Sequence, residues 1–201
     1  MSKGLVCGVG IYEKGKYKAI VSGKATGEYM SWLNMMSRCY NPKVLAKHPT
    51  YKGCTVCDDW REFQNFARWF NVNHPSDGNK YHLDKDFKII GNKIYSPERC
   101  LFVSPSVNVF ILDRGAKSKW GVMGVYWSNS SMKFISRCRN PITGERENLG
   151  RFTDKMTAHK AWRKRKSELA CELAMIQDSD EVKNALLNWR RALDLGEVHP
   201  Y

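Results

Sequence analysis

Hydrophobic residues recur at helical spacing in two stretches of the first half of the chain. Over 28–41 and 58–73 they return every three or four positions, which predicts two amphipathic helices. Apolar residues on both sides of the letters EKGK predict a short β-hairpin over 5–22. The first half is therefore expected to hold a small hairpin and a helical scaffold.

The stretch that follows predicts a strand, a loop, a second strand and a helix, in that order. Residues 83–90 have the composition of a strand, the letters GNK turn the chain, and 100–103 form the second strand. Ser104 is a suitable N-cap and Pro105 suits the first helical position. Asn108 then falls about one turn into the predicted helix.

The pattern changes again in the second half, where three short strands precede a long helix. The expected strands are 121–128, 132–140 and 146–152, and the expected helices are 153–176 and 180–193. The letters DRGAKSKWG, at 113–121, have the composition of a linker. The fold class is therefore α+β, and the expected parts are 1–112, 118–176 and a C-terminal helix and tail over 177–201.

Charge narrows the choice of partner. The chain has a formal net charge of +13 and a sequence pI of about 9.5, and such a surplus favours a polyanionic partner. Within 115–176, thirteen Lys or Arg residues stand against five Asp or Glu. The chain shows no lipidation motif and no terminal basic amphipathic helix, so nucleic acid is favoured over an anionic membrane.

The lengths of the apolar runs and the use of cysteine indicate the cellular compartment. No run approaches the roughly 18–20 apolar residues of a membrane span, and the N-terminal letters lack an apolar signal core. We expect a cytoplasmic protein with no membrane partner and no small-molecule substrate. The seven cysteines are then expected as reduced thiols. Cys54 and Cys57 could join Cys39 and His48 in a zinc site, but a lone CxxC pair is a weak signal and structural Zn²⁺ is not expected there.

Alternation along the predicted strand 132–140 gathers cations on one face. With a period of two, Lys133, Arg137 and Arg139 share this face with Ile135. Such a face is either a solvated surface or one that lies on nucleic acid, where Arg bonds guanine edges and both cations hold phosphates. The residues expected to widen this surface from the flanking strands are Trp127, Arg146 and Arg151.

The letters GVYW, KFISRCR and ENLGRFTDKMTAHKAWRKRK carry a resemblance to the AP2 DNA-binding domain, over about 121–174. Spacing and residue types agree across three strands and one helix. The resemblance implies a three-stranded sheet that reads the DNA major groove and packs on one helix. Loop lengths and the cysteine of the second strand depart from the family pattern, which affects the DNA sequence preference more than the fold.

Two carboxylates flank a lysine in the predicted strand 83–90. If the strand continues, Asp84 and Asp86 share one face with His82. The carboxylates either form surface salt bridges with neighbouring lysines or bind a metal.

The stretch Leu83 to Asn108 resembles the ββα-metal (HNH) nuclease frame, with its core at about 81–112. The resemblance implies that Asp84 and Asn108 hold a divalent cation, Mg²⁺ or Mn²⁺, against the scissile phosphate, with Asp86 as a further ligand.

The position of the family's general base departs from the pattern. Lys85 stands where the family has a histidine, and a lysine is a poor base unless its surroundings lower its pKa. His82 is either a structural histidine or the substitute base, and in the second case Lys85 is expected at the scissile phosphate. The loop residue that orients the base is expected at Arg99 or a neighbour.

Several blocks in order, SWLNMMSRCY, PTYKGCTVCDDWREFQNF, LDKD and GNKIYSPERCLFV, resemble phage-encoded HNH homing-endonuclease-like proteins with a C-terminal AP2 domain. The resemblance implies a metal-dependent endonuclease acting on double-stranded DNA in the cytoplasm of a bacterial host. Two alternatives stay open: a catalytically inactive repressor or accessory factor with a degenerate HNH frame, and an RNA-binding or ribosome-associated protein.

Overall fold

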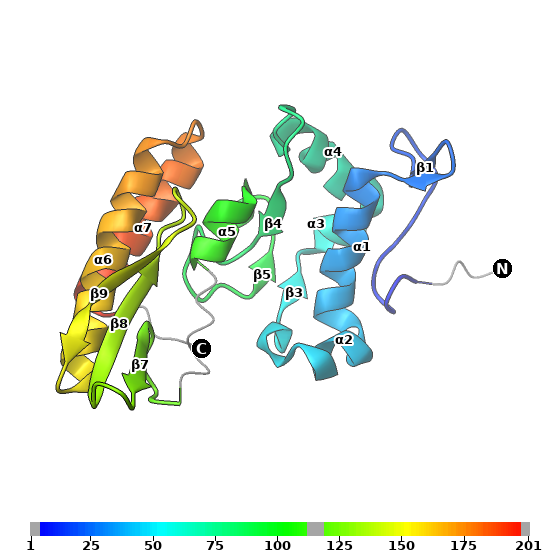
Figure 1. The fold of residues 1–201 in the computed structure, drawn as a ribbon. Helices are drawn as coiled ribbons and strands as arrows, with labels where there is room; N and C mark the ends of the chain where they lie inside the picture. Colours follow the sequence, from blue (N-terminus) through cyan, green and yellow to red (C-terminus); the bar gives the residue numbers. More distant parts are fainter. Residues whose placement is uncertain (1–4, 112–118, 198–201) are drawn as a thin grey trace. The chain divides into compact units, whose positions relative to one another are not determined.

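The computed structural model describes residues 5–111 and 119–197, which fold as two compact units of mixed α and β structure (Figure 1). The division falls between Phe102 and Val103, whereas the sequence predicted it at a linker over 113–121. Of that linker, 113–118 lies outside the described residues. The division falls earlier because the short helix after Val103 packs within the second unit.

The first unit is a helical scaffold with three two-stranded sheets. Its helices are α1 (Gly27–Tyr40), α2 (Pro42–Lys47), the 3₁₀ helix η1 (Pro49–Tyr51), α3 (Asp58–Arg61) and α4 (Phe63–Asn73). Its strands are β1 (Ile20–Val21), β2 (Lys24–Ala25), β3 (Thr55–Val56), β4 (His82–Asp84), β5 (Ile94–Tyr95) and β6 (Leu101–Val103). Strand β1 pairs with β2 antiparallel, β3 with β5 parallel, and β4 with β6.

Aromatic side chains fill the core of the first unit. Trp32 of α1 and Trp60 of α3 are fully buried, and the Trp32 indole donates a 2.8 Å hydrogen bond to the Trp60 carbonyl. Phe63 and Phe66 of α4 are equally buried and pack edge to face against Trp32 and Trp60 respectively. Burial of such large side chains is the main stabilising term in a unit of this size.

Two predictions for the first unit were wrong in detail. The hairpin turns at Ser22 and Gly23, both with positive φ, and not at EKGK. The segment with EKGK instead folds around Gln64, whose amide bonds the backbone of Glu13 and Tyr17. The expected single helix 58–73 is two helices because the Ile11 backbone bonds at Arg61 and Phe63, which interrupts the helix at Glu62.

The second unit is a three-stranded antiparallel sheet covered on one face by a long helix (Figure 1). Its elements are α5 (Pro105–Ile111), β7 (Val125–Ser128), β8 (Lys133–Arg139), β9 (Arg146–Phe152), α6 (Lys155–Met175) and α7 (Asp180–Leu195). The strand order is β7-β8-β9. The predictions of three strands, a long helix and a final helix are confirmed to within a few residues.

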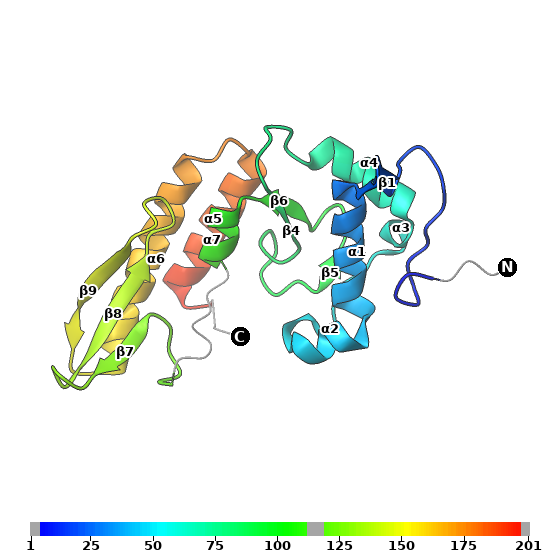
Figure 2. The same ribbon diagram turned by 45° about the vertical axis from the view of Figure 1, so that its right-hand side comes forward.

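Caps and buried side chains explain the two long helices. The Asp154 carboxylate accepts a 2.8 Å bond from the Thr157 amide at the start of α6, and Gly196 ends α7 with a φ of 75°. Trp162 and Leu169 of α6 are buried, and α7 packs along α6 (Figure 2).

A buried lysine ties α5 to this unit. Lys166 of α6 is 5% exposed, and its ammonium donates a 2.6 Å hydrogen bond to the Phe110 carbonyl and lies 3.9 Å from the Phe110 ring centroid. The helix that the sequence assigned to the first part of the chain is therefore held by α6. Among the residues that the structure describes, no helix is long and apolar enough to cross a membrane.

Gly124 offers a test of the packing between α6 and the sheet. Its φ is 71°, and a Cβ there would stand 2.0 Å from the Trp162 ring. Gly144 has a similar φ of 76°, but a Cβ there would meet no atom within 4 Å. We expect Gly124→Ala to lower the melting temperature by about 5 °C or more beyond the loss in Gly144→Ala, because overpacking adds to the shared backbone strain. Equal losses in thermal unfolding would contradict this packing.

Candidate DNA-binding face and carboxylate site

Five cations gather on the uncovered face of the sheet in the second unit. The pairing places Arg151 opposite Ile135 and Arg146 opposite Arg139. Together with Lys133 and Arg137 they form the cationic face, defined by Lys133, Arg137, Arg139, Arg146 and Arg151. All five side chains are exposed. The register shifts between Ser136 and Arg137 because β9 carries one extra residue there, Leu149, and this bulge places Arg146 on the same face as Arg151.

None of these five cations has a countercharge in the described parts of the chain, because no carboxylate lies within ion-pair distance of them. Arg139 and Arg146 stand directly opposite each other, an arrangement that destabilises a sheet unless an anion is present. The cationic face is therefore suited to a polyanion.

Tyr126 shares the cationic face. Its ring lies 4.8 Å from the Arg137 guanidinium, and Tyr126 pairs with Ile135. Asn148, paired with Arg137, supplies an amide on the same face. The sequence prediction missed both residues, because their face depends on how β7 and β9 pair with β8 and not on alternation within one strand.

Trp127 was expected on this face, and the structure contradicts that prediction. It pairs with Phe134, and the two rings lie 4.8 Å apart with Trp120 packed beside them. Phe134 lies on the same face of β8 as Ser136 and Cys138, which is the face that α6 covers, so Trp127 also points to the α6 side of the sheet. The expectation failed because Trp127 is one residue from Tyr126 and alternation sends the two side chains to opposite faces.

On the α6 side of the sheet, one arginine is paired with glutamates. Arg165 of α6 donates bonds of 2.6 and 3.0 Å to Glu147 of β9 and one of 2.7 Å to Glu172. The bonds from Arg165 and Asn140 lower the pKa of Glu147 to about 2. This neutralised arginine contrasts with the unpaired cations on the other face.

Asp84 ends β4 and turns the chain. Its Oδ1 accepts hydrogen bonds from the amides of Asp86, at 3.0 Å, and Phe87, at 2.7 Å. The predicted strand 83–90 was therefore too long, because these bonds bend the backbone after Asp84. Asp86 lies in the turn, so it does not share a strand face with His82, which is exposed on β4.

The Asp84 carboxyl is buried next to a second carboxylate. Burial and the charge of Asp86 raise the pKa of Asp84 to about 7, and the two side chains hydrogen bond with each other. Asp86 is half-buried and also pairs with Lys85. A buried carboxyl next to a second carboxylate favours its protonated form or a bound cation.

Lys85 is a structural cation in this geometry. It is 6% exposed, and its ammonium lies 2.8 Å from Asp86 Oδ2 and 3.2 Å from the Asn92 carbonyl oxygen. Burial lowers the pKa of Lys85, but the bond to Asp86 and its charge outweigh that effect and the net direction is upward. An ammonium with a raised pKa does not act as a base at neutral pH.

Asn92 is the residue that organises the loop, and the sequence prediction missed it. Its amide donates to the carbonyls of Lys85, at 2.6 Å, and Ile94, at 2.7 Å, and its oxygen accepts from Arg99 Nη1 at 3.0 Å. The prediction had placed this role at Arg99 or a neighbour. The letters GNK gave a signal, because a buried asparagine in a glycine loop is the usual means of bonding two nearby backbone groups.

Asn108, the expected helical ligand, lies half-buried in α5, the helix that begins at the predicted N-cap. The Val107 amide donates a 3.3 Å bond to Ser104 Oγ, as a cap requires. Helix α5 belongs to the second unit, whereas Asp84 and Asp86 belong to the first.

The carboxylates fit one kind of metal. Across 5–111 and 119–197, no group of three or more His, Cys, Asp or Glu side chains is placed to hold a metal ion. Mg²⁺ differs from zinc in that it is bound by one or two carboxylates and completes its shell with water and substrate phosphate. Asp84 and Asp86 match that pattern.

The seven cysteines are free thiols. Burial raises the pKa of Cys39 to about 12 and also raises that of Cys57. Cys54 and Cys57 flank β3.

Replacing Asp84 tests the raised pKa. The native state holds the Asp84 proton up to about pH 7 and the unfolded state releases it near pH 4, so this residue removes stability as the pH rises between those values. Asp84→Asn keeps the oxygen acceptor, and we expect it to match the wild type near pH 4 and to melt at least about 3 °C higher at pH 8.

Asp77 provides a control because its pKa is shifted downward, opposite to that of Asp84. Bonds from Tyr81 and Asn79 lower the pKa of its exposed carboxyl, so Asp77→Asn is expected to lose stability above pH 4. Thermal unfolding curves of Asp84→Asn and wild type that stay parallel from pH 4 to 8 would contradict the raised Asp84 pKa.

Comparisons of the chain with protein-family models, with curated proteins and with solved structures found no match. The function of this chain is therefore inferred from the cationic face and from the loop that holds Asp84, Asp86 and Asn92.

Proposed function

We propose that this chain is a metal-dependent endonuclease that binds double-stranded DNA through the cationic face and hydrolyses its phosphodiester backbone at the carboxylate site. The observation that carries the proposal is the set of five exposed cations, without countercharge in the described residues, on the open face of the sheet. The resemblance to AP2 and HNH modules agrees with this division of roles.

The cationic face has the shape and donors for duplex DNA. A small β-sheet enters the major groove, which is about 12 Å wide. Arg137 is supported by the Tyr126 ring and would bond a guanine edge, whereas the outer cations would hold phosphates. Asn148 adds an amide that suits adenine.

The chemistry would use the carboxylates of the first unit. Asp84 and Asp86 would hold Mg²⁺ or Mn²⁺, which stabilises charge on the phosphate and on the leaving oxygen. The HNH resemblance implies a further ligand at Asn108, but Asn108 belongs to the second unit, so the proposed site rests on Asp84 and Asp86 alone. His82, exposed beside Asp84 on β4, is the candidate base for the attacking water, and Asn92 keeps the loop in shape.

A second candidate is a DNA-binding protein without nuclease activity. The specific observation in its favour is Lys85, which stands beside Asp84 and is held by Asp86 with a raised pKa. This residue does not replace a general-base histidine, so the candidate endonuclease depends on His82.

Neutralising the cationic face tests DNA binding. We expect Arg137→Gln/Arg139→Gln to weaken duplex binding at least about tenfold and to reduce the slope of log K against log salt by about 1, because Arg139 is the phosphate contact that is lost and each such contact contributes about 0.9. The control is Lys43→Gln/Lys47→Gln, which removes the same charge from exposed positions of α2. Gel shifts with duplex DNA and duplex RNA give the affinities. Equal losses in both variants, or tighter binding to RNA, would reject the DNA-binding face.

Cleavage of supercoiled plasmid with Mg²⁺ or Mn²⁺ separates the two candidate functions. We expect nicked or linear product from the wild type, none with EDTA or with Asp84→Asn, and a loss of about 100-fold or more with His82→Ala, as for removal of a general base. Wild-type protein that binds duplex DNA tightly but leaves the plasmid intact would establish the second candidate.

A further inference from the structure

An open pocket of about 260 Å³ lies along the first half of α6, and its polar lining consists of donors. It is lined by Met156, Thr157, His159, Lys160 and Arg163. No carboxylate lines it. The Lys164 side chain lies one turn beyond Lys160 and is also exposed. We call Lys160, Arg163 and Lys164 the helical cation patch.

The three cations of the helical cation patch have no ion-pair partner among the residues that the structure describes. Arg163 is half-buried, and its Nη1 lies 2.6 Å from where a Cβ at Gly196 would stand. The glycine at the end of α7 thus leaves room for the guanidinium, and the negative end of the α7 dipole helps to hold it. Arg163 is therefore partly ordered before any ligand binds.

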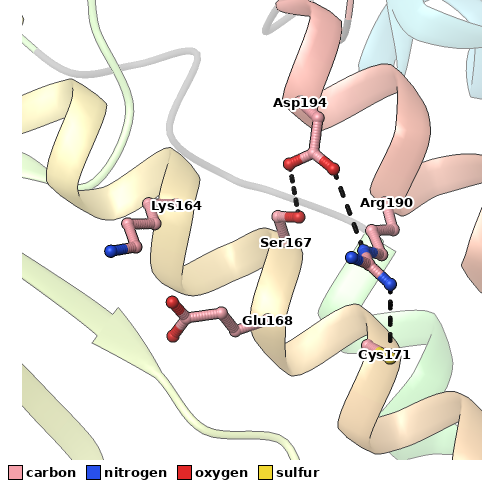
Figure 3. Close-up of a pocket in the computed structure, with 6 residues that line it drawn as sticks. All are labelled: Lys164, Ser167, Glu168, Cys171, Arg190 and Asp194. Carbon is pink, nitrogen blue, oxygen red and sulfur yellow. Dashed lines mark hydrogen bonds and ion pairs between the residues drawn. The ribbon is translucent and has the colours of Figure 1, made fainter.

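The neighbouring pocket shows what a compensated site on the same helices looks like (Figure 3). This pocket, of about 390 Å³, is lined by Lys164, Ser167, Glu168, Cys171, Arg190 and Asp194. Asp194 accepts a 2.6 Å bond from Ser167 and lies 3.8 Å from Arg190. Glu168 and Asp194 make this pocket a poor site for an anion, so the unbalanced charge centres on Lys160 and Arg163, and Lys164 lies at the border between the two pockets.

The helical cation patch points away from the sheet. At about 100° per residue, Lys160 and Lys164 lie roughly 140–180° around the helix axis from Trp162 and Leu169, which are buried on the other side of α6. A helix about 10 Å across separates the patch from the sheet. One duplex lying straight across the cationic face would not reach both surfaces.

We propose that the helical cation patch binds the phosphate backbone of a second segment of duplex DNA, so that the protein bridges two segments. The proposal rests on the DNA-binding role of the cationic face. A duplex backbone suits the patch because it presents phosphates at regular spacing to cations that lie one helical turn apart, and it needs no base recognition.

Bridging is measured by immobilising one biotinylated duplex on beads, adding the full chain, and counting a fluorescent second duplex that is retained. We expect the wild type to retain it and Lys160→Gln/Arg163→Gln/Lys164→Gln to retain at least about tenfold less, with its affinity for a single duplex changed less than about threefold. Lys160→Gln/Lys164→Gln, which keeps Arg163 beside Gly196, is expected to show the same direction of loss. The matched control is Lys43→Gln/Lys47→Gln/Lys52→Gln, which removes three exposed cations elsewhere.

The outcomes distinguish the two surfaces. Arg137→Gln/Arg139→Gln should lose single-duplex binding; if it does not, the proposed role of the cationic face fails whatever the beads show. Wild-type protein that binds one duplex and never retains a second would overturn bridging. Retention that survives loss of the helical cation patch, with a dimer in light scattering of the complex, would assign bridging to two cationic faces and also reject the proposal.

Discussion

A small sheet covered on only one side constrains the whole second unit. Helix α6 packs on one face, so the alternation of β8 sends Ser136 and Cys138 inward and Arg137 and Arg139 to water. The bulge at Leu149 of β9, opposite Ser136 and Arg137, brings Arg146 to the same face as Arg151. A unit of this kind exposes one flat surface on its strands, and here that surface carries cations that have no countercharge within 5–111 and 119–197.

Helix α6 uses each of its faces for a different purpose. One face packs on the sheet through Trp162, another receives α7, and Lys166 holds α5. The remaining surface carries the helical cation patch. The balance of charge along α6 is therefore local: Arg165 is fully engaged by glutamates, whereas Lys160 and Lys164 are not.

The loop of the first unit combines features that cost stability with features that restore it. Asp84 and Asp86 are close enough to raise the pKa of Asp84, which disfavours two charges at neutral pH. Two contacts offset this repulsion: the Lys85 ammonium pairs with the Asp86 carboxylate, and the Asn92 amide bonds the Lys85 backbone. A divalent cation would relieve the same repulsion, which is the physical link between the geometry and the proposed cleavage.

The sequence by itself determined the α+β class, the long helices and the cationic alternation of β8, because these follow from local periodicity and from caps such as Asp154. The pairing of β7 with β8 decided what periodicity could not. It packs Trp127 with Phe134 on the α6 side of the sheet, and it places Tyr126 on the cationic face where Trp127 had been expected. Asp84 shortened a predicted strand through bonds to the amides two and three residues on, which strand alternation does not reveal. Long-range bonds decided the rest: the Ile11 backbone broke one predicted helix, and Lys166 drew α5 to the second unit. Each of these two contacts joins residues that are far apart in the sequence, so the local pattern of residues cannot predict it.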